Sequence, residues 1–262
     1  MKRIYLKILI IGAVLSMACT TKVSEWILLN EAPQKYVLVY FHKNKLTETI
    51  QSQNNEIENQ LKQANILFKT MGTDEIEKPY YALYFNNHLI TKFDDYKAIE
   101  KVAASPLRRK ITSDLKKGSL CVMVFLKNGN KEKDEKGLEE LNKALESSPF
   151  GNIISVVELD RNSVDEKLLV SMLLNVENDL KDIHEPMLFG IFGRFRALEP
   201  LLAKGISEEN IHLMIDFFTA DCSCLIKDNL PGRSILCSEN WENPQPALVN
   251  TILDANPELM HQ

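Results

Sequence analysis

The sequence predicts an α/β protein with mixed sheets flanked by helices. Short apolar runs of strand length alternate with polar segments whose apolar residues fall at helical spacing. This alternation continues through most of the 262 residues and favours parallel or mixed sheets. Hydrophobic residues make up 45% of the chain and charged residues 26%, proportions typical of a globular protein and not of a disordered one.

Residues 1–18 have the pattern of a cleaved export signal. A basic start is followed by the apolar run 8–15, too short to cross a hydrocarbon core of about 30 Å as a helix. The segment Leu15-Ser16-Met17-Ala18-Cys19 resembles the lipobox of bacterial lipoproteins. This resemblance implies that Cys19 becomes the mature N-terminus and carries lipid such as palmitate, with 19–23 as the anchored linker. The alternative is an ordinary secretory signal with an incidental cysteine.

The charge balance limits the partners that we expect. A net charge of −5 argues against nucleic acid, because phosphate binding needs a basic surface. An acidic body also does not adhere to anionic lipid, so we expect contact with the membrane through the lipid anchor alone. By the lipoprotein resemblance the protein belongs in the cell envelope. The outer membrane is favoured over the inner one, since Thr20 shows no retention signal.

The first unit spans residues 24–118. Its run 36–41 is β-branched and aromatic throughout, as in a strand buried on both faces. Asn86-Asn87 separates two strand-like runs and predicts a hairpin, and Ser105-Pro106 supplies a cap and a first-turn proline for a helix. The expected order is strand 36–41, helix 45–63, strand 66–68, strands 80–85 and 88–93, a helix after Asp94-Asp95, and a helix from Ser105 that ends at Gly118.

The second unit spans residues 119–262 and repeats the order. Strand 120–126 is continuously apolar, and Gly193-Arg194 predicts a tight turn between two strand-like runs. Ser207 is a suitable cap for the last amphipathic helix. The expected order is strand 120–126, a helix around 138–145, strand 153–159, helix 164–176, strand 186–192, a return strand 195–202, and a helix around 211–218.

The repeated order resembles the thioredoxin family. Glu185-Pro186-Met187, followed by a strand and a glycine turn, resembles the cis-proline segment of that family. Lys78-Pro79-Tyr80 with its hairpin resembles the same segment in a shorter copy. The resemblance implies two tandem thioredoxin-like domains with cis bonds at Pro79 and Pro186. One larger α/β domain is the alternative.

The redox motif of that family is missing from both units. A thioredoxin needs Cys-x-x-Cys where its first strand leads into a helix, because the helix N-terminus lowers the thiol pKa. The corresponding positions read His42-Lys43-Asn44-Lys45 and Lys127-Asn128-Gly129-Asn130-Lys131, without cysteine. We therefore expect a binding surface in place of a thioredoxin-type enzyme.

The other cysteines leave alternatives open. Cys121 lies within an apolar run, as a small buried hydrophobic residue does. A turn near Leu230-Pro231 would form a C-terminal hairpin and place Cys224 opposite Cys237, with Cys222 on the same face. These three thiols could form a structural disulfide, a strained and reducible Cys222–Cys224 ring, or a soft-metal site.

These observations together predict a membrane-anchored envelope lipoprotein. Its thioredoxin-like domains would act without catalysis or cofactor as a binding or scaffolding module for an envelope protein or peptide. The alternative is a thiol–disulfide oxidoreductase or soft-metal protein that uses Cys222, Cys224 and Cys237.

Overall fold

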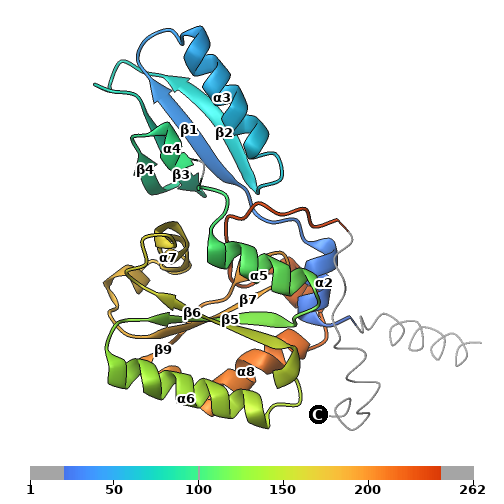
Figure 1. The fold of residues 1–262 in the computed structure, drawn as a ribbon. Helices are drawn as coiled ribbons and strands as arrows, with labels where there is room; N and C mark the ends of the chain where they lie inside the picture. Colours follow the sequence, from blue (N-terminus) through green and yellow to red (C-terminus); the bar gives the residue numbers. More distant parts are fainter. Residues whose placement is uncertain (1–20, 100, 243–262) are drawn as a thin grey trace, which may run out of the picture.

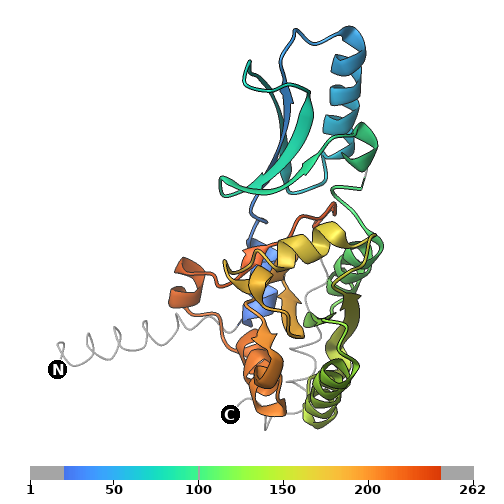
Figure 2. The same ribbon diagram turned by 90° about the vertical axis from the view of Figure 1, so that its left-hand side faces the viewer.

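Two lobes, each built on a mixed β-sheet, are stacked end to end (Figures 1 and 2). The computed structural model describes residues 21–99 and 101–242. The upper lobe holds a four-stranded sheet of order β2-β1-β3-β4. The lower lobe holds a six-stranded sheet in which β9 pairs with β7 beside the path β10-β8-β7-β5-β6. The predicted α/β class, with mixed sheets flanked by helices, is confirmed.

The upper lobe follows the expected strand order closely. Asn86 and Asn87 both have positive φ (47° and 65°), as a tight hairpin turn requires, and they join the third and fourth strands. Thr47 begins the long helix by accepting a hydrogen bond from the Ile50 amide. The elements are β1 (Tyr36–His42), α3 (Glu48–Gln60), β2 (Ile66–Gly72), β3 (Tyr80–Phe85), β4 (His88–Phe93) and α4 (Tyr96–Ile99).

The lower lobe contains the longer helices. The predicted return strand 195–202 forms as two short strands, and the predicted helix 164–176 is shorter than expected. The main elements are α2 (Val23–Asn30), α5 (Pro106–Lys116), β5 (Cys121–Lys127), α6 (Lys131–Ser147), β6 (Ile154–Asp160), α7 (Lys167–Leu173), β7 (Met187–Phe192), β8 (Arg196–Ala197), β9 (Leu201–Leu202), α8 (Glu208–Thr219), α9 (Cys224–Asp228) and β10 (Arg233–Ser234), with short 3-10 turns at Gly151–Ile153, Leu180–Asp182 and Ala203–Gly205.

The two sheets share one strand order. In each, the first strand lies between a parallel second strand and an antiparallel third, and the third pairs antiparallel with the fourth. Pro79 and Pro186 therefore precede corresponding strands, β3 and β7. Their peptide bonds are trans, contrary to the expected cis form. Trans is the default for a bond before proline, and tertiary contacts, which sequence does not display, must impose the alternative.

The helices that precede and follow the upper lobe in the sequence both pack against the lower lobe. Residues 24–30 and 106–116, expected in the first unit, belong to helices that pack against the lower lobe. Helix α2 contacts α8 and β7, and Arg194 donates hydrogen bonds to the carbonyls of Leu28 and Leu29 at 2.7 and 2.8 Å. Helix α5 contacts β5 and β6. The upper sheet is thus inserted between two helices of the lower lobe (Figure 1).

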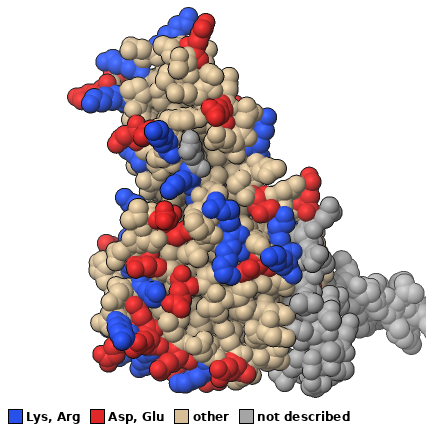
Figure 3. Space-filling view, viewed as in Figure 1, with Lys and Arg blue, Asp and Glu red and all other residues tan. Residues whose placement is uncertain are grey.

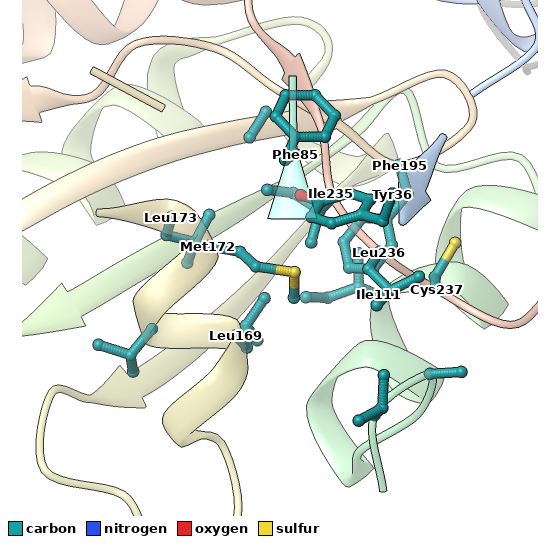
Figure 4. Close-up of a cluster of buried hydrophobic side chains, with 14 of the residues drawn as sticks. Tyr36, Phe85, Ile111, Leu169, Met172, Leu173, Phe195, Ile235, Leu236 and Cys237 are labelled. Atoms are coloured by element: carbon teal, nitrogen blue, oxygen red, sulfur yellow. The ribbon is translucent and has the colours of Figure 1, made fainter. Parts of the chain in front are cut away.

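Strand β5 is the centre of the lower core, and its side chains divide between two faces. One face meets α6 and α8, and the other meets α5 and α7 (Figure 1). The cluster of buried side chains between β5 and the helices α5 and α7 continues into the upper lobe. There Tyr36 and Phe85 meet Leu236 and Cys237 (Figure 4). The Tyr36 hydroxyl donates to the Ser234 carbonyl at 2.9 Å. A shared apolar core therefore joins the lobes. Within residues 21–99 and 101–242, no helix combines the length and apolarity needed to cross a membrane.

Candidate functional site

The β5–α6 junction is the turn Lys127-Asn128-Gly129-Asn130-Lys131, where a central strand leads into a helix. Asp134 is 7% exposed, and its carboxylate accepts hydrogen bonds from the amides of Asn128 and Gly129 at 3.0 and 3.1 Å. The Asn130 side chain caps α6 by accepting from the Lys133 amide. A carboxylate and an amide thus satisfy the backbone donors at this helix start. The junction holds no thiol, and its polar groups serve to build the turn.

The segment before Pro186 is tied to the same junction. The Asn128 side-chain amide donates to the His184 carbonyl at 3.0 Å. The Lys133 ammonium contacts the Glu185 carboxylate at 2.6 Å. These bonds hold the segment against the start of α6. His184 contributes its backbone carbonyl to this contact.

The β1–α3 junction of the upper lobe has a different construction. His42 ends β1, its ring lies 5.9 Å from the Tyr40 ring, and Nδ1 lies 2.9 Å from the Asn44 carbonyl. The Thr73 amide donates to the His42 carbonyl, which ties the junction to the end of β2. Residues 42–47 contain no cysteine and no carboxylate. This segment holds an imidazole but no cysteine, so it offers no thiol chemistry.

The expected C-terminal cysteine hairpin is wrong. Ser223 accepts a hydrogen bond from the Ile226 amide and starts the short helix α9, so Cys224 begins a helix and not a strand. Cys222 belongs to the core cluster beside α8, whereas Cys237 belongs to the cluster between the lobes. Among the described residues, no disulfide joins Cys121, Cys222, Cys224 or Cys237. The structure thus places Cys222 and Cys237 in different core clusters, so the three thiols do not gather at one site.

Cys237 lies at the contact between the lobes. Its amide donates to the Asn65 side-chain oxygen at 2.9 Å, and its carbonyl accepts from the Asn65 amide at 3.3 Å. The side chain is 2% exposed, and burial raises the pKa of the thiol to about 12. Burial also raises the pKa of the Cys121 thiol. Both groups are therefore protonated and poor nucleophiles near neutral pH.

No soft-metal centre is formed by the part of the chain that the structure describes. Within it, no group of three or more histidine, cysteine or acidic residues is arranged to hold an ion. Cys224, at the start of α9, is the exposed one among the four described cysteines. Cys19, the predicted lipid attachment point, lies outside the described residues.

Arg108 is the functional feature that sequence reasoning missed. It belongs to the basic run 108–110, yet its side chain is only 2% exposed. Its guanidinium donates to the carbonyls of Lys101, Val102 and Leu236 at 2.6–3.1 Å and to the Ser105 hydroxyl at 3.0 Å. Burial lowers its pKa to about 10. Its spacing from Ile111 and Leu115, which are buried on the same helix face, was the available signal.

Arg108 and Glu166 together fasten the lobes. Glu166 is 4% exposed and accepts from the Ser105 hydroxyl and from the Leu107 amide, the latter at 2.8 Å. The carbonyls bound by Arg108 come from the connection between the lobes and from the C-terminal segment. The cluster therefore holds the connection between the lobes and the C-terminal segment in place.

The remaining basic residues of α5 do form a solvated surface. Figure 3 shows Lys and Arg side chains gathered over this helix. Lys110 pairs with Asp114 at 2.7 Å, and Lys116 pairs with Glu239 at 2.7 Å. Local carboxylates therefore offset part of the charge.

Two open depressions accompany these features. One, of about 260 Å³, lies between the lobes, where β4 and α4 face α7. The other, of about 460 Å³, lies in the upper lobe between α3 and β2. Comparison with known protein families found no matching family, and a search of curated proteins found no match either. The functional argument therefore rests on the chain's own residues.

Proposed function

We propose that this protein is a lipid-anchored envelope lipoprotein whose two thioredoxin-like lobes bind or scaffold another envelope protein or peptide. The observation that carries the proposal is the β5–α6 junction. A catalytic dithiol of a thioredoxin would lie at this junction. Here the Asp134 carboxylate accepts from the backbone amides of Asn128 and Gly129, and the Asn128 side chain donates to the His184 carbonyl. One fold commonly hosts different functions, so a thioredoxin-like fold without reactive cysteines is compatible with a role in recognition.

The shared strand order supports a common thioredoxin-like origin of the two lobes. Both sheets place the second strand at one side of the first and the proline-led third strand at the other. The trans bonds at Pro79 and Pro186 depart from the family pattern. This departure accords with the absence of a dithiol that a cis-proline would face.

The proposed lack of thiol chemistry predicts a specific labelling pattern. In the native chain, an alkylating reagent should modify Cys224 rapidly, whereas Cys121 and Cys237 should react only after unfolding, because burial protects them. Mass spectrometry of peptides from native and denatured samples makes the measurement. Insulin reduction should stay at background for the wild type and for Cys224→Ser alike. A native disulfide, or activity lost in that variant, would favour the oxidoreductase alternative.

The anchor is tested separately from binding. Mass spectrometry of the N-terminal peptide should find a lipidated Cys19, and a palmitate analogue fed to cells should label the wild type but not Cys19→Ser. Membrane fractionation should place the labelled protein in the outer membrane. An unmodified chain that begins elsewhere would remove the anchor from the proposal.

Binding is tested by site-specific photo-crosslinking in cells. A crosslinking residue at exposed positions of the upper lobe should capture a discrete envelope partner. The same residue at Glu139, on the exposed side of α6, serves as the control. Failure to capture a discrete species from any exposed position of the upper lobe would contradict the binding role.

A further inference from the structure

A polar groove follows one edge of the upper sheet. Its volume is about 460 Å³, and one wall is helix α3 while the other is strand β2. The residues that line it are Leu46, Gln51, Asn54, Asn55, Glu58, Phe68, Lys69 and Thr70. Strand β2 is the end strand of the order β2-β1-β3-β4, so among the described residues no strand pairs with its outer side (Figure 1). The groove thus lies against an open strand edge.

The backbone of β2 presents free hydrogen-bonding groups to this groove. The Asn65 carbonyl and the Thr73 amide both bond to β1 or its last residue, so odd-numbered residues of β2 direct their polar groups inward. Backbone direction alternates along a strand, and Phe68 and Thr70 must therefore direct their N–H and C=O groups outward. These same two residues line the groove. The outward N–H and C=O groups of these two residues have the spacing needed to pair with one more strand.

A second, independent feature points to an occupant. Asn54 is 5% exposed and lines the groove, and its Nδ2 atom has no hydrogen-bond partner. Its Oδ1 is used by the Tyr81 hydroxyl at 3.4 Å, which orients the amide. A buried donor without an acceptor costs free energy that an entering carbonyl would recover. Asn54 thus contributes an unpartnered amide donor to the residues that line the groove.

Side chains on the two faces of β2 define the ligand further. Toward α3, Leu46 and Phe68 offer apolar surface. On the opposite face, Leu67 and Met71 are 42% and 52% exposed, and exposed Lys69 lies between them. Lys69 forms no ion pair with another described residue. A neighbouring strand would place side chains directly opposite these, so apolar, acidic and apolar residues at alternate positions are complementary.

We infer that this groove binds an extended peptide segment of a partner protein, which adds to β2 as a further strand. The segment carries an acidic residue between apolar ones at alternate positions. This is recognition by strand addition, in which backbone bonds give affinity and alternate side chains give specificity. The inference rests on the proposed binding function and assigns it a surface and a ligand class.

A selection with a random linear peptide library displayed on phage tests this inference. The full-length chain in detergent is the target, and the selected peptides are then synthesised. We expect an enriched motif of alternating apolar and acidic residues. In the complex, hydrogen exchange at the Phe68 and Thr70 amides should slow markedly. The affinity should fall about tenfold in Asn54→Leu, because one buried donor is lost. Asn59→Leu, on the exposed side of the same helix, should bind as the wild type does.

Two further changes protect the test against a folding defect. Thr70→Pro removes an outward N–H and should abolish binding, while thermal unfolding checks that the variant is folded. On the ligand, N-methylation at alternate residues should prevent binding in one register and leave it intact in the other. This pattern is specific to backbone pairing.

Several outcomes would overturn the inference. Enrichment of no peptide, or equal binding by Asn54→Leu and Thr70→Pro, would show that the groove is not the site. Protection of both amides without peptide would assign the edge to the chain's own residues 243–262. If that protection rises with protein concentration, a second copy occupies the edge. The crosslinking experiment above is independent of these results and can still support a binding role through another surface.

Discussion

Replacing Arg108 with methionine keeps a long buried side chain but removes its charge and four hydrogen bonds. Three of the acceptors are backbone carbonyls from the lobe connection and the C-terminal segment. The buried Glu166 carboxylate would also lose the electrostatic attraction of the guanidinium. Arg108→Met should therefore weaken the joint between the lobes as well as the lower core.

The magnitude follows from the number of groups left without partners. Each buried acceptor left without a donor costs about 1–3 kcal/mol, and four acceptors lose the Arg108 donor, so we expect a total loss of about 3–5 kcal/mol. Domains are commonly stable by about 5–15 kcal/mol, so this loss is a large fraction of the total. The corresponding fall in melting temperature is on the order of 10 °C for a chain of this size.

Urea unfolding followed by circular dichroism measures the change in the free energy of unfolding. Limited proteolysis, with cleavage mapped to the connection near Lys101 and Val102, measures the loosening of the joint. Arg109→Met, at an exposed position of the same helix, is the matched control and should stay within about 0.5 kcal/mol of the wild type. An Arg108→Met protein that unfolds within about 1 kcal/mol of the wild type, without new cleavage, would refute the reasoning.

Three other predictions concern single buried groups. The Cys237 thiol has a pKa of about 12 in the folded protein and near 9.0 in the unfolded chain. The free energy of unfolding of the wild type should therefore fall by about 1.4 kcal/mol per pH unit between these values. Cys237→Ala should show a smaller dependence on pH in this range. Equal slopes in urea titrations of both proteins would contradict this. Burial raises the pKa of Glu25, so the free energy of unfolding falls as the pH rises through the carboxyl range. Glu25→Gln should raise the free energy of unfolding by about 1 kcal/mol at neutral pH and leave it unchanged in strong acid. An equal gain at both pH values would be evidence against this reasoning. In Gly190→Ala the new Cβ would lie 2.6 Å from Phe218 Cζ and 2.8 Å from Met214 Sδ, so thermal unfolding should show a loss of about 1–3 kcal/mol; an unchanged melting temperature would disprove the close approach of α8 to β7.

The sequence correctly predicted the turns and helix starts that are set by residues close together in the chain. Asn86-Asn87 indicated a hairpin, and both residues have the positive φ of such a turn. Ser105-Pro106 and Ser207 indicated helix starts, and both serines cap helices at their predicted positions. These signals succeed because capping and turn bonds form within three or four residues.

The candidate site was less accessible to sequence reasoning. The absence of a dithiol at both junctions is readable from the chain, but the bond from Asn128 to the His184 carbonyl spans 56 residues. The expected cysteine hairpin failed because Ser223 offered a competing helix cap, a local signal that was overlooked. The groove beside β2 depends on which strand ends the sheet, and pairing order is a long-range property.

By itself the sequence determined the alternation of strands and helices, their repetition, and the lack of reactive cysteine pairs at the two junctions, because composition and short-range periodicity carry that information. Only the tertiary structure decided that α2 and α5 pack on the lower lobe, that Arg108 is buried at the joint, and that β2 is left with an open edge. Burial and strand pairing arise from contacts between distant segments, and the same residue can be solvated or buried according to what packs against it.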